Sequence, residues 1–393
     1  MEASPRDSSW SSAVYEIGHK RDSEAAFANW HRSCIRIYRG SLKGGGMQEQ
    51  AFYRRVEVFC IALSCIVFCY AFAYSQEQTI AEIPGGFEAS DCCIAPESGK
   101  AFCKISNGRE CYIVGEAWKS EVYQIVAGLT VDSKGDVAVF FCKSSAGSIV
   151  MQNDKVLLTN SEDGLVTPRI ALSPNGKLVA IGLSDRSGHI KKIWLEGKVV
   201  AETEESIYQL SLANDPSSLA YSVLASDGTC YVVFKGAKGE SFNSVTAPVV
   251  SADGLMCAYM ASEVDQGFLV LGPKRSKADP RSYQVFMSRN WERVGFCAVL
   301  SQGEGKERGK AVVVDGVESA CFEEILGASF SPDGRRYLFA GKSKTGEWSI
   351  VVDSLSHKTA TLAGPPVFSA SGTQVIYCAI EAGKLIKRRI DLK

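Results

Sequence analysis

The sequence predicts an all-β fold, namely a β-propeller of four-stranded antiparallel blades. Three observations carry this prediction. One turn pattern recurs at intervals of about forty residues along the chain of 393 residues. Runs rich in β-branched and aromatic residues follow each turn, and no long amphipathic helix separates them. Radially repeated four-stranded sheets with units of about 40 residues are typical of propellers.

The repeated turn is clearest as LSPNGK at 172–177 and FSPDGR at 330–335. Its glycine supplies the positive φ that a tight turn of this kind requires. Two weaker copies place Ser217 and Trp291 at this position. Across all copies the position falls at 99, 135, 176, 217, 254, 291, 334 and 372. Eight copies favour eight blades, and the two degenerate copies leave seven open.

The segments between the turns have the composition of strands joined by hairpins. After the turn at 330–335 the run YLFAG follows, and SIVVD comes next after a second turn. A third run follows in several units, for example KVV at 198–200. About four strands fit each unit, which disfavours a parallel α/β sheet. A linear β-solenoid is also disfavoured because its repeats are much shorter.

The SPDG or SPNG turn followed by an aromatic-aliphatic strand resembles the WD40-like, or TolB-like, propeller repeat. The resemblance covers most of residues 78–393 and is most specific at 172–180 and 330–340. The W-D dipeptide of true WD40 repeats is absent. The resemblance implies export and the binding of a protein or ligand, but no single function, since the fold serves many.

An apolar segment at 58–75 precedes the repeats. Arg54 and Arg55 lie before it and the small-residue site at 71–73 ends it, as in a secretory signal peptide. Its length is also close to that of a membrane-spanning helix, so a cleaved signal and an anchor both stay open. We therefore expect a signal or anchor helix within 47–75 and a propeller over 76–393. Residues 1–46 are expected to be disordered, or to be upstream DNA translated ahead of a true start at Met47. The alternative is a cytoplasmic tail.

Cysteine usage indicates core residues more than a disulfide framework. Of 14 cysteines, most of those beyond the apolar segment lie inside apolar runs, as at 142, 257, 297 and 378. Cys103 and Cys111 flank an Asn-Gly turn at 107–108, so we expect these two to form a disulfide across a hairpin.

Nothing in the sequence forms a recognisable catalytic constellation. The G-x-S-x-G pattern of serine hydrolases and the C-x-x-C pattern are absent. His189 and His357 are the only histidines in the expected propeller. We therefore assign no catalytic, cofactor-binding or metal-binding residue, expect no cofactor, and favour a non-enzymatic role without excluding an enzyme.

A basic segment at 272–281 is expected to be the longest loop between blades. It carries Lys274, Arg275, Lys277 and Arg281, which are candidates for contact with an acidic partner. The formal net charge is −1, so no nucleic-acid partner is expected, and membrane contact is expected only through 58–75.

Three function classes follow from these observations. A periplasmic or extracellular propeller that binds a protein or small ligand at its face is the first. A glycosidase-like or lactonase-like enzyme with paired carboxylates around the channel is the second. A structural part of an envelope complex is the third.

Overall fold

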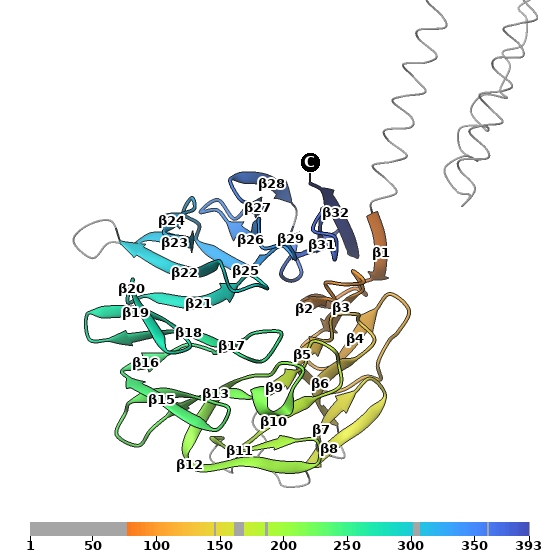
Figure 1. The fold of residues 1–393 in the computed structure, drawn as a ribbon. Helices are drawn as coiled ribbons and strands as arrows, with labels where there is room; N and C mark the ends of the chain where they lie inside the picture. The colour runs from red at the N-terminus through yellow and green to blue at the C-terminus, as the bar shows by residue number, and fades with distance from the viewer. Residues whose placement is uncertain are drawn as a thin grey trace, which may run out of the picture. The chain divides into compact units, whose positions relative to one another are not determined.

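Antiparallel sheets that follow one another around a ring make up the described part of the chain (Figure 1). This computed structural model describes residues 77–144, 147–160, 169–184, 188–301, 307–359 and 361–392. Within them the one helical element is the 3-10 turn η1 (Pro216–Ser218). The prediction of an all-β chain of antiparallel four-stranded sheets is confirmed.

The strands follow the order of the repeats. They are β1 (Glu77–Glu82), β2 (Glu88–Ile94), β3 (Ala101–Ser106), β4 (Cys111–Gly115), β5 (Ile125–Val131), β6 (Ala138–Ser144), β7 (Gly147–Gln152), β8 (Lys155–Asn160), β9 (Arg169–Leu172), β10 (Val179–Ser184), β11 (Ile190–Leu195), β12 (Lys198–Ser211), β13 (Ala220–Leu224), β14 (Cys230–Phe234), β15 (Ala237–Phe242), β16 (Ser244–Val245), β17 (Val249–Val250), β18 (Cys257–Glu263), β19 (Gln266–Leu271), β20 (Lys274–Ala278), β21 (Ser282–Met287), β22 (Val294–Ser301), β23 (Glu307–Val314), β24 (Val317–Glu318), β25 (Glu324–Phe330), β26 (Tyr337–Lys342), β27 (Trp348–Val352), β28 (Leu355–Thr359), β29 (Thr361–Leu362), β30 (Val367–Phe368), β31 (Gln374–Glu381) and β32 (Lys384–Asp391).

In most sheets, neighbouring strands are consecutive in sequence. The orders are β2-β3-β4, β5-β6-β7-β8, β21-β22-β23-β24 and β25-β26-β27-β28. In the sheet β16-β18-β19-β20, β17 also pairs with β18. The remaining large sheet runs from β9 to β15 because the long strand β12 belongs to two four-stranded units. Lys198 near its start pairs with Leu195 of β11, and Ser211 at its end pairs with Ala220 of β13.

The last sheet contains both ends of the described chain. Its order is β1-β32-β31-β29, with β30 also paired to β31, so the first strand in sequence is the outermost strand of the last sheet. Strand β31 in turn contacts β2 of the first sheet. A buried apolar cluster crosses this seam and includes Ala89, Ile105, Ile376 and Leu385. The ring is therefore closed by strand pairing within one sheet and by side-chain packing between two.

The repeated turn has a hydrogen-bonding pattern that explains its sequence. The Ser331 hydroxyl accepts a bond from the backbone N–H of Arg336 at 3.0 Å and donates to the carboxylate of Asp333 at 2.6 Å. The same carboxylate accepts the N–H of Arg335 at 3.1 Å. Equivalent serine-centred bonds recur at three further buried serines, namely Ser173, Ser251 and Ser288. Serine and Asp or Asn are thus selected because they satisfy backbone N–H groups inside the turn.

Six of the glycines expected at the turn have φ between 64° and 72°, as the pattern predicts. Trp291 takes the position in one degenerate copy and itself has φ 63°. The copy around Ser217 is replaced by η1, in which the Ser217 N–H donates to the Asp215 carboxylate.

Side chains between neighbouring sheets form the core. One cluster joins Leu338 and Ile350 of one sheet to Val375 and Tyr377 of the next. The cysteines predicted to be core residues are buried, with exposed fractions of 0–4%: Cys142, Cys257, Cys297 and Cys378. Burial raises the pKa of the Cys257, Cys297 and Cys378 thiols to about 12, so they remain protonated at neutral pH.

The expected signal or anchor segment at 58–75 and the expected boundaries at 46 and 75 lie outside the described residues. Within residues 77–392, apart from the undescribed gaps, no helix is long and apolar enough to cross a membrane.

Candidate binding site

The inner strand of each unit carries a solvent-exposed residue, which lies at or near the start of the strand except in β12, where it lies in the second half of this long strand. Because the inner strands of a propeller all run in the same direction, these positions lie at one mouth of the ring. They are Glu88, Ile125, Arg169, Tyr208, Ser244, Tyr283, Glu324 and Thr361. Their chemistry is mixed, with two tyrosines and two carboxylates.

Both tyrosines sit in β-bulges. In β12, Ile207 pairs with Val223 and Gln209 with Ser222, which leaves Tyr208 as the extra residue. In β21, Ser282 and Gln284 pair with consecutive residues of β22, which leaves Tyr283 as the extra residue. A bulge turns the side chain of the extra residue away from the regular ladder, and bulges are common next to binding sites. Tyr208 and Tyr283 remain 42% and 36% exposed.

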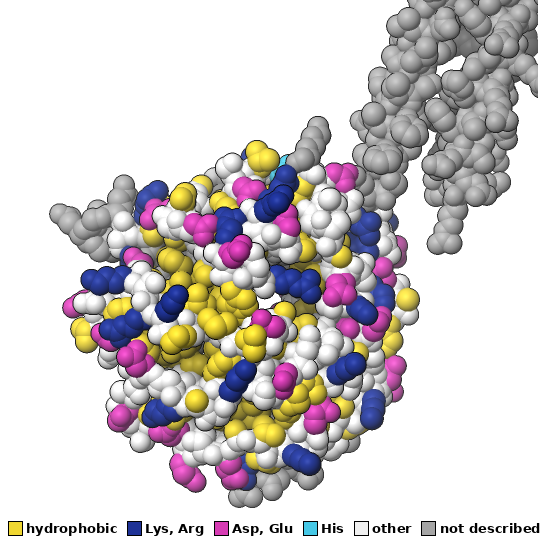
Figure 2. All heavy atoms as spheres, in the orientation of Figure 1, with side chains coloured by type: hydrophobic (Ala, Val, Ile, Leu, Met, Phe, Trp, Pro, Cys, Tyr) yellow, Lys and Arg dark blue, Asp and Glu magenta, His cyan; other side chains and the backbone are white. Residues whose placement is uncertain are grey.

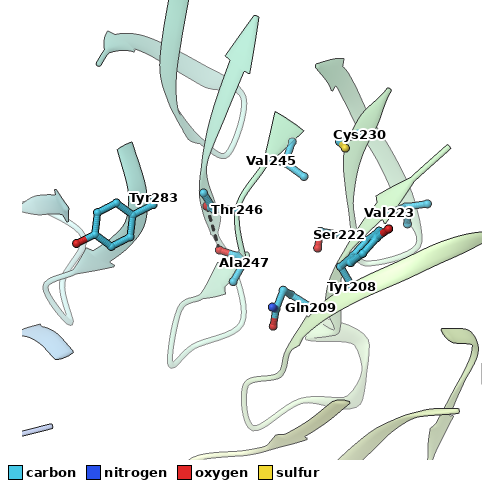
Figure 3. A pocket seen from close by; sticks show the side chains of 9 residues that line it. All are labelled: Tyr208, Gln209, Ser222, Val223, Cys230, Val245, Thr246, Ala247 and Tyr283. Atoms are coloured by element: carbon cyan, nitrogen blue, oxygen red, sulfur yellow. Dashed lines mark hydrogen bonds between the residues drawn. The ribbon is translucent and has the colours of Figure 1, made fainter. Parts of the chain in front are cut away.

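A pocket of about 340 Å³ is lined by residues that include both tyrosines, and the ring of Tyr283 points away from Tyr208 (Figure 3). Three successive units contribute its walls, which places it at the junction of the sheets that contain β12, β16 and β21. Its lining consists of Tyr208, Gln209, Ser222, Val223, Cys230, Val245, Thr246, Ala247 and Tyr283. On the face seen in Figure 2, hydrophobic side chains gather over β17, β18 and β21, the sheets that flank this junction.

The segment between β16 and β17 forms a fixed wall of the pocket. The Thr246 hydroxyl accepts the N–H of Met260 at 3.0 Å, and the Thr246 N–H donates to the Met260 carbonyl oxygen at 2.9 Å. The same hydroxyl lies 3.5 Å from the carbonyl oxygen of Ala247, the contact dashed in Figure 3. Thr246 is thus held by its own sheet and offers the pocket its methyl group and backbone.

The lining is neutral at physiological pH. Burial raises the pKa of the Cys230 thiol and of the Tyr283 hydroxyl, so both keep their protons. Among the described residues, the side chains of Tyr208 and Gln209 make no hydrogen bond to another side chain or to the backbone. An apolar wall with free phenol and amide groups suits a neutral ligand that has a flat apolar part and at least one hydrogen-bonding group.

Carboxylates do not converge on this pocket. The exposed acids at the mouth are Glu88 and Glu324, which come from the first sheet and from the sheet β25–β28, with the last sheet between them. Glu324 lies 3.7 Å from the ammonium of Lys342. No carboxylate belongs to the lining of the pocket. The site therefore has the composition of a binding pocket and lacks the paired acids that glycoside hydrolysis requires.

The middle of the basic segment at 272–281 is a strand, β20 (Lys274–Ala278), contrary to the expectation of an interblade loop. Lys274, Arg275 and Lys277 lie on β20, the outermost strand of its sheet. Arg275 lies over the Phe268 ring at 4.4 Å and is 3.4 Å from Glu240. Arg281, after the strand, pairs with Asp279 at 3.6 Å. The prediction failed because charged residues also protect an exposed sheet edge, and the sequence alone does not distinguish these two uses.

The expected Cys103–Cys111 disulfide is absent, because Cys103 is bonded to Cys92. Cys103 pairs in register with Val114, and Cys111 with Ser106, so the two expected partners are not opposite each other. A bulge in β2 between Ser90 and Cys93 brings Cys92 against β3 instead. The Asn-Gly turn was correctly placed, but the alternation of side chains across the hairpin puts Cys111 in another cluster.

Comparison with known proteins assigns no family to this chain. Neither a protein-family model nor a curated protein matches the chain. Solved structures that resemble it include the Dos1 propeller, with 9% identity and a TM-score of 0.46 over 81% of this chain and 95% of that chain. Hydrazine synthase of Kuenenia stuttgartiensis has 12% identity and a TM-score of 0.44, over 70% of this chain and 99% of that one. TolB from Acinetobacter baumannii has 12% identity and a TM-score of 0.34, over 64% and 79%.

These neighbours include β-propellers, and the repeated turn of this chain resembles the repeat of such proteins. Identities and TM-scores at this level carry no information on ligand, activity or location. The propeller architecture of this chain therefore rests on its own sheets.

Proposed function

We propose that residues 76–393 form one closed propeller of eight blades that acts outside the cytoplasm as a binding module. Its binding site is the pocket lined in part by Tyr208 and Tyr283. Support for eight blades comes from the eight repeated turns and from the division of β12 between two units. The single observation that carries the binding role is that two exposed, bulged tyrosines are among the residues that line a neutral pocket.

Support for export comes from the Cys92–Cys103 disulfide, since structural disulfides persist mainly in oxidising compartments. The apolar segment at 58–75, which follows two arginines, is the proposed signal or anchor. If it is a cleaved signal, the mature chain begins near Tyr74. N-terminal sequencing of exported protein checks this, and a chain found only in the cytoplasm would contradict the proposed location.

An acidic partner is proposed for the edge of β20. Lys274 and Lys277 are exposed there and, among the described residues, form no ion pair. Replacing both with glutamate should abolish salt-sensitive binding of a polyglutamate peptide. Unchanged binding would show that these lysines only protect the sheet edge.

The pocket is tested with a ligand-observed NMR screen of small phenols and aromatic amides against the full chain. We expect several to bind wild type, and Tyr208→Ala and Tyr283→Ala each to weaken binding about fivefold, since stacking on an aromatic ring contributes about 1 kcal/mol. Val264→Ala is the matched control, because Val264 is 85% exposed and outside the pocket. Fragments that bind both tyrosine variants as well as wild type, or a screen without any hit, would refute this pocket as the binding site.

A further inference from the structure

Three buried cysteines meet where the first and last sheets join. Cys92 lies in β2, Cys103 in β3 and Cys378 in β31. Their Sγ atoms all lie within 4.8 Å of one another, and the residues are only 1%, 0% and 0% exposed. Cys92 and Cys103 are 11 positions apart, whereas Cys378 is brought in only by closure of the ring. No local cysteine motif marks this cluster, so the sequence predicted no metal ligand.

The backbone fixes the three positions relative to one another. The N–H of Ala363 donates to the carbonyl oxygen of Cys378 at 3.0 Å. The carbonyl oxygen of Ala363 accepts the N–H of Cys92 at 3.0 Å. Cys103 is held in the β2–β3–β4 ladder, opposite Val114. The cluster is thus built by two sheets and does not depend on a flexible loop.

We propose that the Cys92, Cys103 and Cys378 thiolates bind one soft monovalent cation of the Cu(I) type once the Cys92–Cys103 bond is reduced. A dithiol reductant supplies two electrons and two protons, which breaks the S–S bond, gives two thiols, and leaves the reductant as its own disulfide. The cation then replaces the three thiol protons, which are released to solvent. The metal keeps its charge throughout, so binding itself transfers no electrons.

The ligand set selects the class of cation. Thiolates are soft donors and favour Cu(I), zinc and iron–sulfur centres. Structural zinc takes four ligands in a tetrahedron, and among the described residues no fourth His, Cys, Asp or Glu atom joins the three sulfurs. Full burial also keeps water from the fourth position. Three sulfurs in a dry site therefore favour a three-coordinate monovalent ion.

A positive side chain lies beside the cluster. Lys387 pairs in register with Cys378, and its side chain is 5% exposed. Three thiolates and one monovalent cation carry a net charge of −2, which is costly in a buried site unless a cation is near. Lys387 places a positive charge beside Cys378, and it shares that charge with the carboxylate of Glu116, to which it also bonds.

The test titrates the full chain with Cu(I), kept anaerobic after reduction by a dithiol that is then removed, in competition with a coloured Cu(I) chelator. We expect wild type to bind one equivalent and Cys378→Ser to bind at least tenfold more weakly. Cys257→Ser is the matched control, because Cys257 is as buried but lies in another cluster. X-ray absorption should show three sulfur neighbours at about 2.3 Å, near the usual length of a metal–thiolate bond.

Peptide mapping shows whether the Cys378→Ser variant still folds. Oxidised Cys378→Ser should still contain the Cys92–Cys103 disulfide, which shows that the variant folds. Three results would each overturn the proposal. They are equal Cu(I) affinity in wild type and Cys378→Ser, loss of Cu(I) binding in Cys257→Ser as well, and a wild type that binds no equivalent of Cu(I) tightly. The pocket lined in part by Tyr208 and Tyr283 is unaffected by any of these results.

Discussion

Lys387 of β32 donates a hydrogen bond to the carboxylate of Glu116, which lies 271 positions earlier in the sequence. The same ammonium donates to the carbonyl oxygen of Gly99 at 3.2 Å. Both acceptors follow strands of the first sheet, and Lys387 belongs to the last, so this buried ion pair crosses the seam of the ring. Gln78 of β1 also lies 3.3 Å from Glu116 and adds the outermost strand to the same contact.

The ion pair between Lys387 and Glu116 should contribute measurably to stability. Lys387→Met leaves the Glu116 carboxylate, whose side chain is 22% exposed, without its cation. We expect a loss of about 2 kcal/mol in the free energy of unfolding, below the 3–5 kcal/mol typical of a fully buried pair. Urea unfolding measures it, and adding Glu116→Gln should recover part of the loss.

The control for this pair is Lys358→Met. Lys358 and Glu347 are 3.1 Å apart with side chains 77% and 58% exposed, so their pair should contribute at most about 0.5 kcal/mol. Equal losses at positions 387 and 358 would show that the seam pair has no special role.

Gly364 is expected to be essential for closure of the seam. A Cβ atom built at this position would lie 2.2 Å from the carbonyl oxygen of Cys92, and backbone cannot move aside cheaply. Gly364→Ala should therefore destabilise the chain by about 1–3 kcal/mol, the usual cost of overpacking. Gly85→Ala is the control, since nothing lies within 4 Å of its added Cβ. Thermal unfolding that shifts equally in both variants would contradict this assignment.

Stability should fall at alkaline pH. Burial raises the pKa of the Cys297 thiol from 9.0 to about 12, so between these pH values the thiol ionises only in the unfolded chain. Ionisation then favours unfolding, and the stabilisation present below pH 9 is lost as the pH rises to about 12. One such thiol changes the free energy of unfolding by at most about 1.4 kcal/mol per pH unit.

Cys297→Ala should reduce this slope, measured by urea unfolding from pH 8 to 11. Val351→Ala, a buried and non-ionising control, should lower stability equally at every pH. A slope that Cys297→Ala leaves unchanged would show that this thiol does not contribute to alkaline unfolding.

Local chemistry predicted the repeats because the turn carries its own hydrogen-bonding groups. Ser331 and Asp333 satisfy backbone N–H groups within five residues, so their sequence pattern survives in several copies. The same turn pattern predicted the turn at Trp291, although this position carries no glycine.

Contacts between distant segments could not be predicted in this way. Pairing of β1 with β32 joins residues at opposite ends of the propeller and leaves no local signal. Cys92 faces Cys103 only because of a bulge, and Tyr208 and Tyr283, which both line the proposed binding pocket, are each the extra residue of a bulge. Register and bulges depend on neighbouring strands, so these features required the structure.

The closed ring is the central claim, and deletion of residues 358–393 tests it most directly. This deletion removes β29 to β32, the partners of β1, and exposes the faces of the first sheet and of the sheet β25–β28. Thermal and denaturant unfolding of the chain with and without these residues is the measurement. A closed propeller predicts that the shortened chain aggregates or loses its cooperative transition, because free edges and two apolar faces are exposed together. A soluble truncated chain that melts cooperatively within a few degrees of the parent would contradict the closed ring and indicate an open stack of independent repeats.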